Sequence, residues 1–167
     1  TWINADDQLE RYAFSFLAAL DDSSKAAKIN WVTGLQSVKR KGGAKQTFGV
    51  PLARELISLG LCDGKHWRHV QQEGTFWRWG LWQCAGASRR IASHRYAGDW
   101  RLWYEFAKFD ELYQAQMPLG VFNFREGQLS QSLANEYALE INGVITADKR
   151  RANFEKVRVS GASYSEL

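Results

Sequence analysis

Apolar side chains recur at helical spacing in several parts of this chain, and that periodicity restricts its fold more than any other feature. Leu102, Phe106, Phe109 and Tyr113 fall at i, i+4, i+7 and i+11, so in a helix they share one face. The same spacing occurs within residues 9–20. Such a face has to be buried against other elements, which predicts a core built largely from packed helices.

Weaker apolar patterns, bounded by glycine, proline and small polar residues, predict further helices. They cover residues 23–41, 51–60, 63–70, 129–141 and 146–157. We therefore expect a mainly α protein, a helical bundle of about five to seven helices. Its 167 residues suit a single domain, which we place over residues 1–160, with a flexible tail over residues 161–167.

Two short segments have the alternation of a β-strand instead. In the stretch TFWRWGLW, Trp77 and Trp79 fall two residues apart, which is the period of a strand. We expect a short β element around 75–82 or 119–124, and an α+β fold is the alternative. If the first segment is a strand, Trp77 and Trp79 point into the core and Trp82 lies nearer to a partner surface.

The segment of residues 65–104 is rich in both tryptophan and arginine. It holds six of the eight tryptophans, six arginines and one lysine, against only Glu73 and Asp99. The net charge of the whole chain is +4, so this segment accounts for the positive balance. Arginine offers phosphate a planar fork, and tryptophan stacks on nucleobases. Together they meet the two requirements for binding a single nucleic-acid strand.

A second group of cations lies in the stretch VKRKGGAKQTFG. Lys39, Arg40, Lys41 and Lys45 surround two glycines, which predicts an exposed, mobile loop. Clustered cations displace counterions from a polyanion. We therefore expect this loop to be a second phosphate contact.

These features predict a non-enzymatic nucleic-acid-binding protein, an accessory subunit or inhibitor in a nucleoprotein assembly. The ligand is DNA or RNA, and protein partners in the assembly are expected as well. The predicted binding residues are cations and one tryptophan: Lys39, Arg40, Lys41, Lys45, Arg68, Arg78, Trp82, Arg89, Arg90, Arg95 and Arg101. No catalytic residue is assigned.

Two alternative functions stay open. Aromatic clefts also bind sugars, so one alternative is a small helical glycan hydrolase with Glu126 as its acid. The carboxylate pairs that suit such an enzyme are Asp99 with Glu105, and Glu126 with Glu136. The other alternative is a phage or mobile-element assembly protein, whose Trp/Arg-rich segment docks a protein partner.

Other patterns predict neither a metal nor a cofactor. The spacing of Cys62, His66, His69, Cys84 and His94 matches no zinc-binding motif. No stretch of the sequence is long and apolar enough to span a membrane, and the first residues lack the features of a signal peptide. We therefore expect a cytoplasmic protein with reduced thiols.

Overall fold

The fold of this molecule is built around paired β-strands as well as packed helices. A computed structural model describes residues 1–23, 29–125 and 133–159. Within them two mixed β-sheets form, one of four strands and one of three. The protein is therefore mixed α/β, and the prediction of a mainly α helical bundle was wrong. The tail predicted over residues 161–167 lies outside the described residues.

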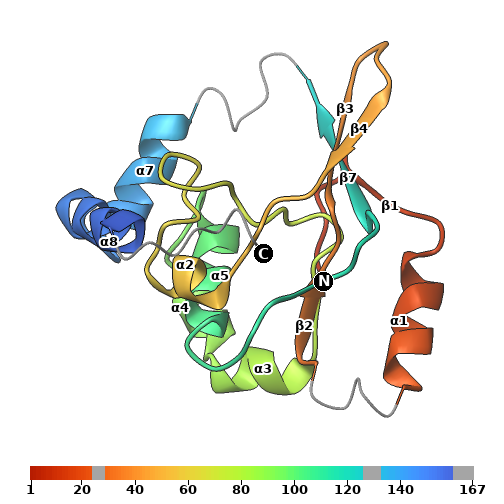
Figure 1. The fold of residues 1–167 in the computed structure, drawn as a ribbon, viewed down its shortest axis with the longest axis horizontal. Helices are drawn as coiled ribbons and strands as arrows, with labels where there is room; N and C mark the ends of the chain where they lie inside the picture. The colour runs from red at the N-terminus through yellow and green to blue at the C-terminus, as the bar shows by residue number, and fades with distance from the viewer. Residues whose placement is uncertain (24–28, 126–132, 160–167) are drawn as a thin grey trace.

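Most of the described helices lie on one side of the larger sheet (Figure 1). In chain order they are α1 (Ala13–Asp21), α2 (Arg54–Ser58), α3 (Trp79–Cys84), α4 (Ala87–Ile91), α5 (Gly98–Phe106), α7 (Ala134–Asn142) and α8 (Ala147–Val159). Only α1 lies on the other side, at the right of Figure 1. The longest has 13 residues, and in the described part of the chain no helix could cross a membrane.

The larger sheet has the strand order β1-β7-β3-β4. Its strands are β1 (Gln8–Leu9), β3 (Gln36–Arg40), β4 (Lys45–Phe48) and β7 (Gly120–Phe124). Strand β7 confirms the β element expected around 119–124. Strands β3 and β4 form an antiparallel hairpin, so the prediction of a mobile loop between two helices was wrong.

The smaller sheet has the order β5-β2-β6, with β2 (Trp31–Thr33), β5 (Phe76–Trp77) and β6 (Tyr113–Gln114). On one face Trp31 lies opposite Trp77, and both rings pack in the main core with Trp103 and Phe106. The other face is covered by α1 through a second, smaller core. The sheet thus separates two apolar layers.

The helix predicted over residues 23–41 is replaced by β2 and β3. The amide of Leu35 donates to the carbonyl of Met117 at 3.0 Å, and Val38 pairs with Phe122 on β7. Gly34 lies so close to the segment before β7 that a Cβ there would be 2.4 Å from the amide nitrogen of Leu119. The partners of this segment are far away in the chain, so the local apolar spacing was misleading.

Several other helix predictions are confirmed within one or two turns. Helix α2 falls in the segment 51–60, and Gly60 follows it with a φ of +75°. Helix α8 begins after Thr146, whose hydroxyl accepts from the amide of Lys149. The predicted helix over residues 63–70 does not form. There Asp63 accepts the amides of the two residues Lys65 and His66 and orders a loop.

Candidate nucleic-acid interface

Two lysines face each other directly across the β3–β4 hairpin. Lys39 and Lys45 are register partners on antiparallel strands, so their side chains lie on the same face of the sheet. Like charges placed opposite each other destabilise a sheet unless an anion lies between or beside them. Lys45 has such a partner in Glu10, with which it forms a salt bridge. Lys39 is exposed, and its charge is available to a ligand.

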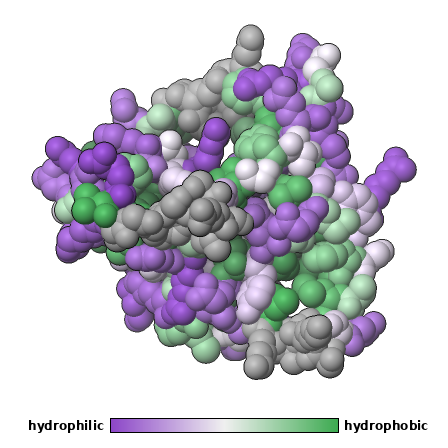
Figure 2. Space-filling model, in the orientation of Figure 1, coloured by the Kyte–Doolittle hydropathy of each residue, from purple (hydrophilic) through white to green (hydrophobic). Residues whose placement is uncertain are grey.

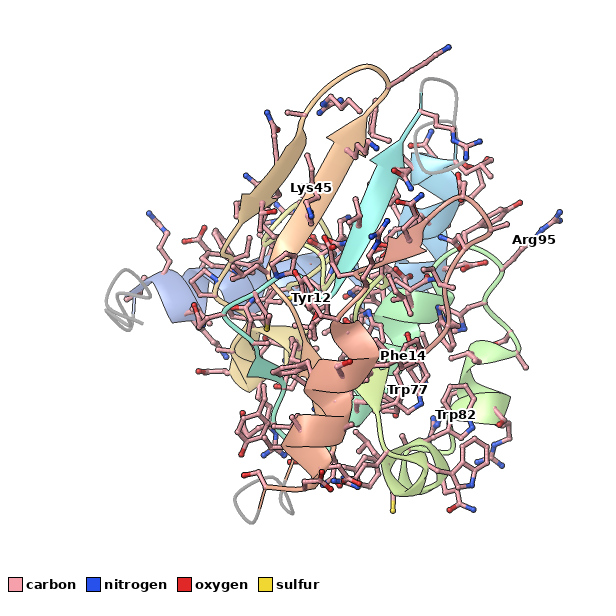
Figure 3. All side chains as sticks on the ribbon, turned by 90° about the vertical axis from the view of Figure 1, so that its right-hand side faces the viewer. Tyr12, Phe14, Lys45, Trp77, Trp82 and Arg95 are labelled. Carbon is pink, nitrogen blue, oxygen red and sulfur yellow. The ribbon has the colours of Figure 1, made fainter. Side chains whose placement is uncertain are left out.

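These lysines line an open hollow of about 720 Å³ on the sheet. Its lining residues are Gln8, Leu9, Glu10, Arg11, Lys39, Lys45 and Val121. Three of them are cations and one is a carboxylate, so the lining has an excess of positive charge. We call this hollow the basic hollow. Figure 3 shows Lys45 on the sheet face that it lines.

The other predicted cations on and beside the hairpin do not line the basic hollow. Arg40 follows Lys39 in the strand and so lies on the opposite face, where its guanidinium sits 4.3 Å from the ring centre of Phe124. Lys41 is exposed in the turn. Arg68 lies over Phe48 at the end of β4, 5.7 Å from its ring centre. The hairpin therefore presents cations on both faces and at its tip.

Two aromatic side chains at the start of α1 adjoin the basic hollow. Tyr12 is 37% exposed and Phe14 is 64% exposed. In Figure 3 Tyr12 lies below Lys45, and Phe14 lies farther down α1. Burial and the nearby carboxylate of Glu10 raise the pKa of Tyr12, so its ring stays neutral at physiological pH. Phe14 meets Phe76 edge-on at 6.1 Å. Cations and exposed rings thus occur next to each other.

The arginines predicted in residues 65–104 do not gather on one surface. Arg101 is largely internal, because its side chain is 11% exposed and its guanidinium binds the buried Glu105 at 2.8 Å. Arg90 approaches the same carboxylate at 3.9 Å. Arg78, next to α3, forms a salt bridge with Asp21. These three arginines mainly compensate carboxylates of the protein itself.

Arg89 and Arg95 have a different environment. Arg89 lies exposed on α4, and Arg95 lies in the following loop with its guanidinium 5.5 Å from the ring centre of Tyr96. Figure 3 shows Arg95 well away from Lys45. These two residues are open to solvent but do not line the basic hollow.

The tryptophan predictions for residues 75–82 were partly wrong. Strand β5 ends at Trp77, and α3 begins at Trp79, so the strand alternation stops there. Trp79 is 65% exposed, against the expectation that it is buried. Trp77 does pack against the main core, and Trp82 packs there too. The ring nearest to solvent is therefore Trp79 and not Trp82.

Arg11, Tyr12 and Phe14 were not predicted as site residues. The apolar spacing within residues 9–20 predicted one continuous helix there, which gave the polar residues of the stretch ERYAF no role. The helix in fact begins at Ala13, after the chain has passed through β1. The signal that could have identified them was a cation and two rings within four consecutive positions.

Of the carboxylates considered for glycan hydrolysis, Glu105 has a structural role. It binds both Arg101 and Lys108, each within 2.9 Å, so its oxygens are engaged in ion pairs within the protein. It lies on the same helix as Asp99. Glu126 lies outside the described residues.

A second hollow, of about 380 Å³, lies between α1 and the smaller sheet. Its walls include Leu17, Leu20, Val32 and Phe76. The guanidinium at its edge, Arg78, is bound to Asp21. This apolar groove does not suit a polyanion, and the basic hollow is the better candidate site.

Comparisons with protein families, curated proteins and solved structures found no match for this chain. The function has to be argued from the geometry of the chain itself.

Proposed function

We propose that this protein binds nucleic acid through the basic hollow and the β3–β4 hairpin. The observation that carries the proposal is the placing of Lys39 directly opposite Lys45, beside Arg11 on an open sheet face. A phosphate between the two lysines would relieve their mutual repulsion and would release counterions. Phosphate contacts of this kind position a nucleic acid without selecting its sequence.

The wider role proposed is that of a non-enzymatic accessory subunit or inhibitor of a nucleoprotein assembly, acting in the cytoplasm. An exposed free thiol, Cys84, is in keeping with a reducing compartment. Leu139 on α7 and Val159 at the end of α8 are both exposed. A protein partner in such an assembly would cover apolar side chains like these.

The first prediction concerns the two opposed lysines. The double variant Lys39→Gln/Lys45→Gln should weaken binding of a labelled 20-nucleotide strand about tenfold or more at moderate salt. It should also flatten the plot of log K against log salt, since each lost phosphate contact lowers the slope by about 0.7 for a single strand. Fluorescence anisotropy over a salt series measures both quantities.

The matched control removes two lysines from another surface, the largely hydrophilic one over α8 at the left of Figure 2. Lys149 and Lys156 are exposed on α8, so Lys149→Gln/Lys156→Gln changes the net charge by the same amount. It should leave affinity and salt slope close to the wild-type values. Equal losses in the two double variants would mean that only the overall charge matters, and the proposed site would be rejected.

A further inference from the structure

A column of three near-parallel indole rings runs from the core to the surface. Trp77 stacks on Trp82 with centroids 5.8 Å apart and planes 11° apart. Trp82 stacks on Trp79 at 6.0 Å and 13°. The inner end rests on the main core, where Trp77 meets Trp103 edge-on at 5.7 Å. Its outer ring, Trp79, is 65% exposed.

The column is held rigidly, which distinguishes Trp79 from an ordinary exposed side chain. Trp79 and Trp82 lie three residues apart in α3, so the helix aligns their rings. The indole N–H of Trp82 donates to the hydroxyl of Ser88 at 3.0 Å, which fixes the middle ring. A ligand that stacks on Trp79 therefore meets a preorganised surface and orders few side chains on binding.

The helix that follows the tryptophan column in the chain carries cations. Helix α4 follows α3 through Gly86, which has a φ of +58°, and the two helices pack together. It carries the exposed Arg89, whereas Arg90 approaches the carboxylate of Glu105. A flat ring with a guanidinium group on the adjoining helix complements a nucleobase and its phosphate.

We infer that Trp79 is a stacking platform for an unpaired nucleobase, and that the ligand of this protein is single-stranded nucleic acid. The inference rests on the proposed function and adds the strandedness of the ligand. In a duplex both faces of each internal base are covered by neighbours. In a single strand a base can turn out and extend the tryptophan column by one ring, as bases do on other aromatic platforms.

The test compares three ligands of equal length: a single strand, its duplex, and a strand whose residues lack bases. Trp79→Ala should weaken binding of the single strand about 5- to 150-fold, the range expected for losing one stacked base. Binding of the duplex and of the base-free strand should change less than about twofold. The salt slope should stay that of the wild type, because no phosphate contact is lost.

Two further variants control for folding and for general loss of an exposed ring. Trp79→Phe keeps a flat ring and should restore most of the affinity for the single strand. Phe109→Ala removes another exposed aromatic side chain, 54% exposed, and should have no effect. Quenching of tryptophan fluorescence by the base-containing strand, lost in Trp79→Ala, reports on the platform directly.

The outcomes separate this inference from the proposed function. If Trp79→Ala binds the single strand as tightly as the wild type while Lys39→Gln/Lys45→Gln does not, the platform is rejected and the proposed function stands. The platform is also rejected if Trp79→Ala weakens all three ligands equally. If the wild-type protein binds none of them, the proposed function fails and this inference fails with it.

Discussion

Glu73 is a buried carboxyl group whose protonation depends on folding. It is only 5% exposed, and it lies where the backbone of residues 73–74 crosses the start of β7. Burial, the charge of Asp7 and a hydrogen bond with that carboxylate raise the pKa of Glu73 to about 8, and Asp99 adds to the effect. The folded protein therefore holds a proton there that the unfolded chain releases at a lower pH.

The second prediction follows from this shift. The pKa of Glu73 is raised from 4.5 to about 8 by folding, so unfolding releases a proton between these two pH values. The free energy of unfolding should then fall as the pH rises through that window. Glu73→Gln removes the titrating group and keeps a donor for Asp7. The free energy of unfolding of the variant should exceed that of the wild type only slightly at pH 4, and by about 2–4 kcal/mol at pH 8.

Urea unfolding at several pH values measures this difference. Glu155→Gln, on the exposed side of α8, is a control that should keep the pH dependence of the wild type. A Glu73→Gln protein that is less stable than the wild type at pH 8 would show that the charged form of Glu73 is the one that the fold requires.

Among the elements, β7 connects the parts of the molecule. It pairs with β1 on one side and with β3 on the other, and it therefore positions both the basic hollow and the hairpin. Its first residue, Gly120, passes so close to the loop before β5 that a Cβ would lie 2.5 Å from the backbone carbon of Glu73. The opposing Gly74 has a φ of +81°, a conformation that other residues rarely adopt.

The third prediction tests this crossing. Gly120→Ala should lower the free energy of unfolding by about 2 kcal/mol or more, because the clash is with backbone atoms that cannot rotate away. Gly80→Ala is the control, since a Cβ there meets no atom within 4 Å. In α3 it should be neutral or stabilising by up to about 1 kcal/mol. Similar free energies of unfolding for the two variants, measured in urea, would contradict the close approach of the two backbone segments at Gly120.

At the scale of the whole molecule, one buried arginine connects the C-terminal helices α7 and α8 to the loop after α2 by hydrogen bonds. Arg150 of α8 is 4% exposed. Its guanidinium binds Asp63 at 2.9 Å and Asn142 at 3.0 Å, and it also donates to the carbonyl of Ile145. A residue of the loop after α2 is thus joined to both α7 and α8.

The fourth prediction concerns this connection. Arg150→Ala removes the buried guanidinium that pairs with Asp63 and leaves the carboxylate with the ring of His66 and two backbone amides. The variant should lose about 3 kcal/mol of unfolding free energy. Arg151→Ala, next to it, removes an exposed ion pair with Asp148 and should change stability by less than about 1 kcal/mol. Thermal unfolding of the two variants compares them. A small effect of Arg150→Ala would mean that α8 packs independently of the Asp63 loop.

The sequence was informative where a structure depends on neighbouring residues. The proline and glycine around α2 and the cap of α8 at Thr146 act within a turn or two of the helix, so their patterns could be interpreted directly. The apolar stripe at 102–113 was only half right: Leu102 and Phe106 are buried in α5, which ends at Phe106. Beyond it Phe109 is exposed, and Tyr113 is exposed in strand β6. Prediction of the strand at 119–124 also rested on local residue types. The four cations of the hairpin were recognised as a group for the same reason.

Tertiary structure decided what depended on distant partners. Residues 31–40 became strands because β5 and β7 supplied hydrogen bonds and apolar faces from far along the chain, and these outweighed a helical spacing. The arginines of residues 65–104 were separated because Glu105 and Asp21 bound three of them. Composition and local spacing set the chemical character of this protein, whereas which rings and charges face solvent depends on contacts between segments that lie far apart in sequence.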